Sequence, residues 1–122
     1  MHTVISDGAH APEEVVAMAR RAGLRVIAIT DHDALDAIAP ARAAAGGDLE
    51  VIAGVEISCE GPQGEVHLLA YHIDIDNAPL GEALARSRHT RIGRAQAMLE
   101  RLRALGIDIP WERVRHLAGD GA

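Results

Sequence analysis

Several residue types are scarce or absent in this chain of 122 residues, and each scarcity excludes a class of protein. The single cysteine, Cys59, cannot form an internal disulfide, which agrees with a reducing compartment. Tyr71 and Trp111 are the only aromatic residues, which argues against base-stacking platforms for single-stranded nucleic acid. The chain has no apolar run of membrane-spanning length. Its N-terminus also lacks a basic region followed by a hydrophobic stretch, the pattern of a signal peptide. We therefore expect a soluble, cytoplasmic protein with no membrane partner.

Lysine is also absent, so all twelve basic residues are arginines, and the formal net charge is −6. This acidity argues against an extended nucleic-acid-coating surface, because such surfaces are usually basic. The arginine bias has two interpretations, namely codon bias in a GC-rich genome or selection for a side chain that binds phosphate through two parallel hydrogen bonds.

One apolar run, over residues 26–30, ends abruptly in Asp31, His32 and Asp33. A near-continuous apolar run is typical of a buried parallel strand. In α/β folds, the residues just beyond the carboxyl end of such a strand face the site of chemistry. Metal-competent side chains occur at or beside three further segments, namely at His2 and Asp7, at Glu56 and at His67. We predict that these segments belong to one metal site.

The other elements follow from turn residues and periodicity. We predict strands over 25–30, 50–58 and 65–72, and helices over 12–23, 36–45 and 79–105, with a last short helix opening at Pro110. The helix over 36–45 is expected to be interrupted near Pro40. The strand–helix–strand spacing predicts a parallel sheet, and the turn residues over 60–64 predict an antiparallel partner. With about four strands, the chain is either a compact open-sheet domain or the front part of a larger barrel.

Each candidate ligand at the first two segments has a simpler alternative. His2 and Asp7 lie around a Ser-Asp-Gly sequence, which is also ordinary turn chemistry. His32 is flanked by two acids, either of which could cap the following helix. Ligation and these structural roles therefore both remain open for this part of the chain.

The strand residues are open to a similar choice. Glu56 lies in an apolar strand, where a carboxylate without a partner would cost several kcal/mol, so a cation or an arginine must lie near it. His67 is either a ligand or a satisfied core histidine. We assign His10, His89 and His116 to the surface, and His72 has weaker support than His67. Taken together, mixed histidine and carboxylate ligands on successive strand ends are typical of Zn²⁺, Mn²⁺ or Fe²⁺ sites.

Four segments resemble, in order, the first four motifs of the PHP (polymerase and histidinol phosphatase) domain: His2-Thr3-x-x-Ser6-Asp7-Gly8, Ile29-Thr30-Asp31-His32-Asp33, Gly54-Val55-Glu56-Ile57-Ser58 and Val66-His67-Leu68-Leu69-Ala70-Tyr71. The resemblance is greatest to stand-alone bacterial phosphoesterases that act on nucleoside 3′,5′-bisphosphates and short oligonucleotides. It implies an α/β fold, the front part of a distorted (β/α)₇ barrel, with residues 1–78 in the barrel and 79–122 as a helical insertion.

The resemblance also implies a set of roles at a site with up to three divalent ions, Mn²⁺ before Zn²⁺ or Fe²⁺. His2 would bind the first ion, Glu56 would bridge the first two, and His67 would bind the second. Asp7 and His32 would bind the third. Asp33 would be a catalytic acid near the reacting phosphate.

Arginines on the helix over 79–105 offer a further expectation. Arg86, Arg88, Arg91 and Arg94 span more than two turns, so only some can face a substrate. We predict phosphate contact for Arg88 and Arg91, whereas the alternative is a solvated helix face.

The implied activity is metal-dependent hydrolysis of phosphate esters in a small substrate, a nucleotide or short oligonucleotide. In the family pattern, one histidine would precede Met1 and later ligands would follow Ala122, the next motif beginning near 119–122. A non-catalytic metal-binding or interaction fragment is therefore a second hypothesis, and association with another copy is possible on grounds of burial. An amidohydrolase-like C–N hydrolase is the third.

Overall fold

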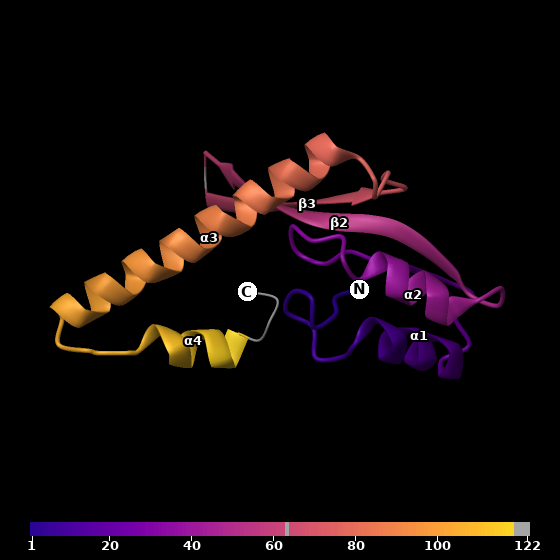
Figure 1. Cartoon of the computed structure of the whole chain (residues 1–122), viewed down its shortest axis with the longest axis horizontal. Helices are drawn as coiled ribbons and strands as arrows, with labels where there is room; N and C mark the ends of the chain where they lie inside the picture. The colour runs from indigo at the N-terminus through magenta and orange to yellow at the C-terminus, as the bar shows by residue number, and fades with distance from the viewer. Residues whose placement is uncertain (63, 119–122) are drawn as a thin grey trace.

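Three strands form the sheet of the computed structural model, which describes residues 1–62 and 64–118 (Figure 1). Strand β1 (Val26–Ile29) pairs in parallel with β2 (Glu50–Gly61), and β2 pairs antiparallel with β3 (Gly64–Tyr71). The predicted parallel crossover and antiparallel hairpin are both confirmed. Residue 63 of the predicted turn over 60–64 lies outside the described residues. The motif start expected near 119–122 lies outside them as well.

The estimate of about four strands was too high, because the described residues contain three. The chain before α1 forms turns instead of a strand. Only the backbone of Met1 lies beside β1, where its amino group donates to the Ala28 carbonyl oxygen at 2.9 Å and its carbonyl oxygen accepts from Thr30 N–H at 2.8 Å. These two hydrogen bonds place the start of the chain along the open edge of β1.

Within the described residues, four helices accompany the sheet, α1 (Pro12–Arg21), α2 (Ile38–Ala45), α3 (Ala78–Ala104) and α4 (Trp111–Ala118). Pro12 begins α1, where a missing N–H costs no helical hydrogen bond, and Glu13 and Glu14 occupy its first turn. Helix α2 starts two residues later than predicted and is not interrupted. Pro40 lies in its first turn, where backbone N–H groups have no partner within the helix.

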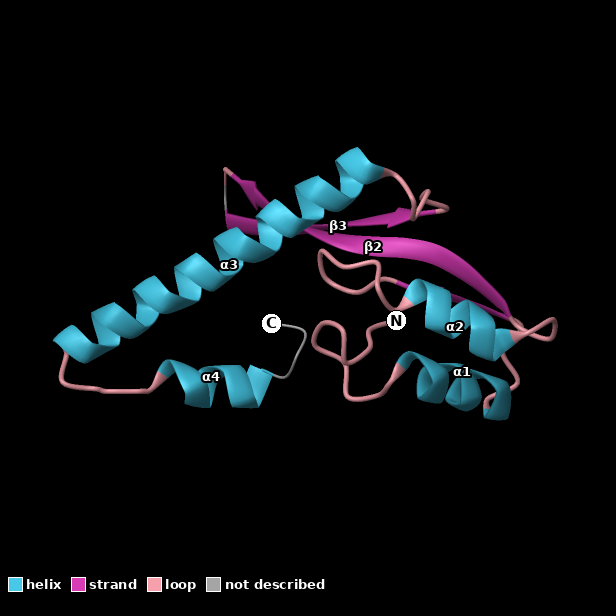
Figure 2. Cartoon of the chain, viewed as in Figure 1, coloured by secondary structure: helices cyan, strands magenta, loops and turns pink. Residues whose placement is uncertain are grey.

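The core lies between the first two helices and the parallel strand pair (Figure 2). Helices α1 and α2 pack together, and α2 also packs on β2. Val16, Ile29, Ile38 and Val55 are essentially inaccessible to solvent. Burying each such side chain contributes roughly 1.5–3 kcal/mol, so this core holds β1 and the first half of β2 in place.

The third helix makes few core contacts. Within α3, all of whose residues are described, only Leu84 is buried. Asn77 caps its start by accepting a hydrogen bond from Leu80 N–H at 2.9 Å. The helix lies across the β2–β3 pair and then extends beyond it towards α4 (Figure 1).

Strand β3 leaves much apolar side-chain surface accessible to solvent. Val66, Leu68, Leu69 and Tyr71 are each about half exposed. Across the described residues, no helix combines the length and apolar character required to cross a membrane.

Candidate metal centre

The loop before α1 is held against β1 by one buried carboxylate. Asp31 is fully buried and accepts hydrogen bonds from Thr3 N–H at 2.7 Å, the Thr3 hydroxyl at 2.9 Å and the Ser6 hydroxyl at 2.6 Å. Gly8 closes the loop, since a Cβ atom there would lie 2.5 Å from the His2 carbonyl carbon. These contacts place His2 and the loop carrying Asp7 beside the end of β1.

The pairing of β1 and β2 continues beyond the end of β1. His32 forms a parallel bridge with Glu56, in which Glu56 N–H donates to the Asp31 carbonyl oxygen and Asp33 N–H to the Glu56 carbonyl oxygen, at 3.2 and 3.0 Å. Carboxyl ends of adjacent parallel strands meet at the same edge of a sheet. This register therefore sets His32 directly beside Glu56.

Strand β3 adds the fourth segment of the site through its antiparallel register. Ser58 pairs with His67, and Glu56 pairs with Leu69, so Glu56 and His67 are diagonal neighbours on one face. Their side chains meet, with His67 Nδ1 2.8 Å from Glu56 Oε1.

The five predicted ligands form one cluster. Glu56 Oε2 lies 3.1 Å from His2 Nε2 and 4.0 Å from His32 Nε2. Asp7 approaches the other ring nitrogen of His2, with Oδ1 3.1 Å from His2 Nδ1. Its Oδ2 lies 3.6 Å from His32 Nε2. The His32 ring centroid is 4.9 Å from those of His2 and His67. Glu56 therefore lies between three imidazoles.

The donor set fits a divalent metal ion. His2, His32 and Glu56 each offer one ligand atom, and these atoms lie within 4.8 Å of one another. Within the described residues, the buried Nδ1 atoms of His2 and His32 make no hydrogen bond. Asp7 Oδ1 lies near His2 Nδ1 but without hydrogen-bond geometry. A buried nitrogen without a hydrogen-bond partner is energetically costly, and a bound ion would remove that cost. A donor set of imidazole and carboxylate suits Zn²⁺, Mn²⁺ or Fe²⁺.

The amino group of Met1 also lies at this edge of the sheet. It donates to the Thr30 hydroxyl oxygen at 3.0 Å as well as to Ala28. Burial lowers the pKa of the Met1 amino group, and the carboxylates of Asp31 and Glu56 partly oppose that shift. Burial thus reduces the tendency of this group to carry positive charge beside the cluster.

The structure places Asp33, Arg88 and Arg91 against one another. The Asp33 side chain is fully buried, accepts a hydrogen bond from Ser58 N–H at 3.1 Å and forms an ion pair with Arg91. Arg88 donates to the carbonyl oxygen of Asp33. The sequence had predicted that Asp33 faces a reacting phosphate and that both arginines contact substrate. In the structure Arg91 contacts the Asp33 carboxylate and Arg88 its carbonyl oxygen, and the substrate contacts stay predictions.

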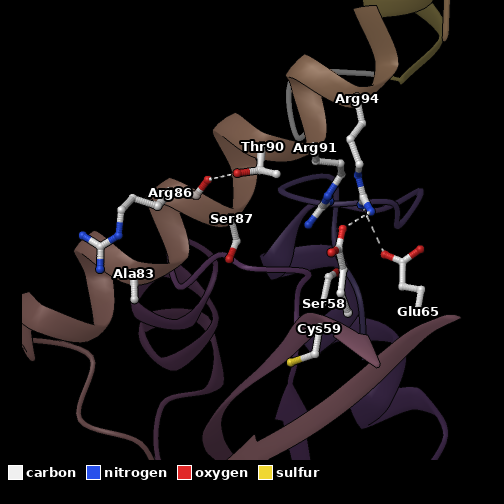
Figure 3. Close-up of a pocket in the computed structure, with 10 residues that line it drawn as sticks. Ser58, Cys59, Glu65, Ala83, Arg86, Ser87, Thr90, Arg91 and Arg94 are labelled. Atoms are coloured by element: carbon white, nitrogen blue, oxygen red, sulfur yellow. Dashed lines mark hydrogen bonds and ion pairs between the residues drawn. The ribbon is translucent and has the colours of Figure 1, made fainter. Parts of the chain in front are cut away.

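A pocket of about 280 Å³ lies between α3 and the β2–β3 pair, and Figure 3 shows it. Ser58, Arg91 and Arg94 line it. Arg94 lies 3.5 Å from carboxylate oxygens of both Glu60 and Glu65. The arginines that border the pocket are therefore largely engaged with acidic side chains.

Sequence reasoning missed the partners that hold these acids. Thr3 and Ser6 secure Asp31, and they lie in the first motif without any signal of that role. The contact between Asp33 and Arg91 joins residues 58 positions apart, so no local pattern could reveal it. The surface assignment of His10, His89 and His116 is confirmed, since all three are exposed.

With this geometry established, comparison with known proteins defines the class. The profile of the PHP domain matches residues 1–108. The chain therefore belongs to the PHP domain family.

Two curated relatives illustrate the similarity. The 5′-3′ exoribonuclease Rnm of Escherichia coli K12 is 40% identical over 99% of this chain and 42% of its own length. The 3′,5′-nucleoside bisphosphate phosphatase of Chromobacterium violaceum is 36% identical over 87% of this chain and 38% of its own length. The chain thus spans about two fifths of the length of these two relatives.

Solved structures give the same result for the fold. A candidate metal-dependent phosphoesterase from Bifidobacterium adolescentis superposes with a TM-score of 0.85 and 34% identity, over 98% of this chain and 42% of that one. An amidohydrolase from Chromobacterium violaceum, with bound sulfate and no metal, gives a TM-score of 0.79 and 35% identity over 88% of this chain and 38% of that one. The predicted α/β fold, part of a PHP barrel, is confirmed.

Proposed function

We propose that this chain provides metal-binding residues of a metal-dependent hydrolase that cleaves phosphate esters of nucleotides or short RNA. The observation that carries the proposal is the convergence of His2, His32 and Glu56, whose ligand atoms lie within 4.8 Å of one another. The names of the exoribonuclease and the bisphosphate phosphatase support this class of substrate.

The proposed ligands are His2, Asp7, His32, Glu56 and His67. The two carboxylate oxygens of Glu56 face different imidazoles, Oε2 towards His2 and Oε1 towards His67. This division supports a bridging role for Glu56 between two ions, because a carboxylate can offer one oxygen to each. Mn²⁺ is the proposed ion. Zn²⁺ and Fe²⁺ bind the same imidazole and carboxylate donors, so they are tested beside Mn²⁺ in the same assay.

Divalent ions at this site would supply Lewis-acid polarisation of a phosphate oxygen and a more acidic water. The residues of the chain would orient the reactants. Glu56 is largely buried, with a side chain 15% exposed, whereas His67 is 42% exposed. Asp7, at 67%, is exposed as well, so a phosphate ester would enter where Asp7 and His67 border the cluster. Asp31 would hold the loop of His2 and Asp7 in place throughout the reaction.

Phosphate release from adenosine 3′,5′-bisphosphate with Mn²⁺ present tests the proposal, with a 5′-phosphorylated RNA trinucleotide as the second substrate. The matched control is Glu56→Gln, which keeps the size of the side chain but removes its charge. We expect turnover by the unaltered protein and loss of turnover in the variant. Absence of turnover on both substrates, under conditions in which Mn²⁺ binds, would overturn the assignment.

A second function is favoured by one specific observation, the amidohydrolase name of the superposable Chromobacterium violaceum structure. The same assay separates the two, because N-acyl substrates can be offered in place of phosphate esters. Hydrolysis of the amide alone would support the C–N hydrolase. Metal binding with no turnover of either class would support a purely metal-binding role.

A further inference from the structure

Asp33 is the residue through which helix α3 contacts the end of β1. It directly follows the candidate ligand His32, and its φ of 50° lies in the left-handed region, which Asp adopts more readily than most residues. Its N–H donates to the Glu56 carbonyl oxygen at 3.0 Å, and its Oδ1 accepts from Ser58 N–H at 3.1 Å. Asp33 is therefore joined to β2 at Glu56 and at Ser58, on either side of Ile57.

The remaining polar atoms of Asp33 are satisfied from α3. Arg91 forms the ion pair with Oδ2, and Arg88 donates to the carbonyl oxygen. Residues three apart on a helix share a face, so both guanidinium groups reach the same point from one turn of α3. The Asp33 side chain is fully buried, and a buried carboxylate requires such compensation.

The charges around the pocket argue against a simple phosphate-binding role for these arginines. Arg91 is engaged by Asp33, and Arg94 by Glu60 and Glu65. Arg86 is the contrasting case, since its side chain is 71% exposed and its acidic neighbour Glu82 is a similarly exposed surface residue. A phosphate would have to displace existing carboxylates from Arg91 and Arg94.

We propose that Arg91, assisted by Arg88, is a positioning residue that acts through Asp33 to hold His32 and Glu56 in ligating geometry. Helix α3 thereby sets the affinity of the metal centre without contacting the metal. This inference rests on the metal site of the proposed function, and its test uses metal binding so that the two can fail separately. Partners that orient metal ligands typically change metal affinity about 10–100-fold when they are removed.

The experiment measures Mn²⁺ affinity by isothermal titration calorimetry for the whole chain and its variants. We expect Arg91→Gln to bind Mn²⁺ at least about tenfold more weakly and Arg91→Lys, which keeps the charge, to recover part of that loss. Arg86→Gln, on an exposed position of the same helix, is the matched control and is expected to stay within about twofold of the unaltered chain.

Coupling between Asp33 and Arg91 is tested by combining Asp33→Asn with Arg91→Gln. If Arg91 acts through Asp33, the double variant binds Mn²⁺ no more weakly than the poorer single variant, because each change removes the same interaction. Losses that multiply in the double variant would show independent roles and overturn the proposal.

Folding is followed by circular dichroism for every variant. Should Arg91→Gln fail to fold, Arg91→Lys is judged by the same criterion, a loss of Mn²⁺ affinity beyond that of Arg86→Gln. Unchanged Mn²⁺ affinity in folded Arg91 variants, with a raised KM for adenosine 3′,5′-bisphosphate, would identify a substrate contact and overturn the positioning role. An Arg91-dependent metal site without phosphoesterase turnover would refute the proposed function and leave this inference standing.

Discussion

Asp31 accepts two hydrogen bonds from Thr3, one from its main-chain N–H at 2.7 Å and one from its hydroxyl at 2.9 Å. This double contact joins the start of the chain to the end of β1. It separates the roles of the two acids beside His32, since Asp31 holds the loop of His2 and Asp33 holds helix α3.

Replacing Asp31 by alanine is expected to destabilise the protein. The change leaves the buried donors of Thr3 and Ser6 without their acceptor, at about 1–3 kcal/mol per group. We expect the free energy of unfolding, measured by urea denaturation, to fall by about 3 kcal/mol or more. Asp36→Ala, at an exposed position, is the control and is expected to change it by less than about 0.5 kcal/mol. Equal stabilities would contradict the anchoring role.

Removing one imidazole of the cluster is expected to weaken metal binding more than removing a surface imidazole. His32→Ala deletes a ligand atom from the group formed with His2 and Glu56, so Mn²⁺ affinity should fall by about 100-fold or more. His89→Ala is the control, because His89 is exposed on α3, where its Nδ1 lies 2.8 Å from the Ala85 carbonyl oxygen of the same helix. Calorimetric titration with Mn²⁺ gives both values, and similar affinities in the two variants would exclude His32 as a ligand.

A methyl group at Gly54 is expected to disrupt the junction of the three strands. A Cβ atom there would lie 2.9 Å from the Ala70 carbonyl oxygen and 3.0 Å from that of Ile29, both of them backbone atoms with little freedom to move. We expect Gly54→Ala to lower the free energy of unfolding by about 1–3 kcal/mol. Gly81→Ala in α3 meets no atom within 4 Å and should raise it slightly, by up to about 1 kcal/mol. Thermal unfolding of both variants decides the point.

Metal removal is expected to lower the unfolding temperature. A ligand that binds only the folded state stabilises it by about 2.7 kcal/mol at a free concentration one hundred times its Kd. Excess Mn²⁺ should therefore raise Tm, and a chelator should reverse the increase. In Glu56→Gln the Mn²⁺-dependent increase should largely disappear, because the carboxylate between His2 and His67 is lost. An equal increase in the variant would place the ion elsewhere.

Local pattern was a good guide to the elements and a weaker guide to their ends. The apolar run of β1 and the turn residues before β3 predicted the correct pairing directions. The helix around Pro40 was displaced, because the pattern could not show that the first turn begins at Ile38. The expected fourth strand had no residue range in the sequence pattern, and the described residues form three strands.

The sequence by itself determined the chemical types at the site, and for His32 and Glu56 it also indicated their convergence, because the strands that carry them are parallel neighbours. Residue pattern alone did not distinguish Asp31 from Asp33, which are identical in charge and equally close to His32, and only the family resemblance pointed to Asp33 as the acid near the reacting phosphate. Only the tertiary structure decided their roles, through partners far away in the chain: Thr3 and Ser6 for Asp31, and Arg91 for Asp33. A buried carboxylate takes its function from the groups that compensate its charge, and those groups are brought to it by packing alone.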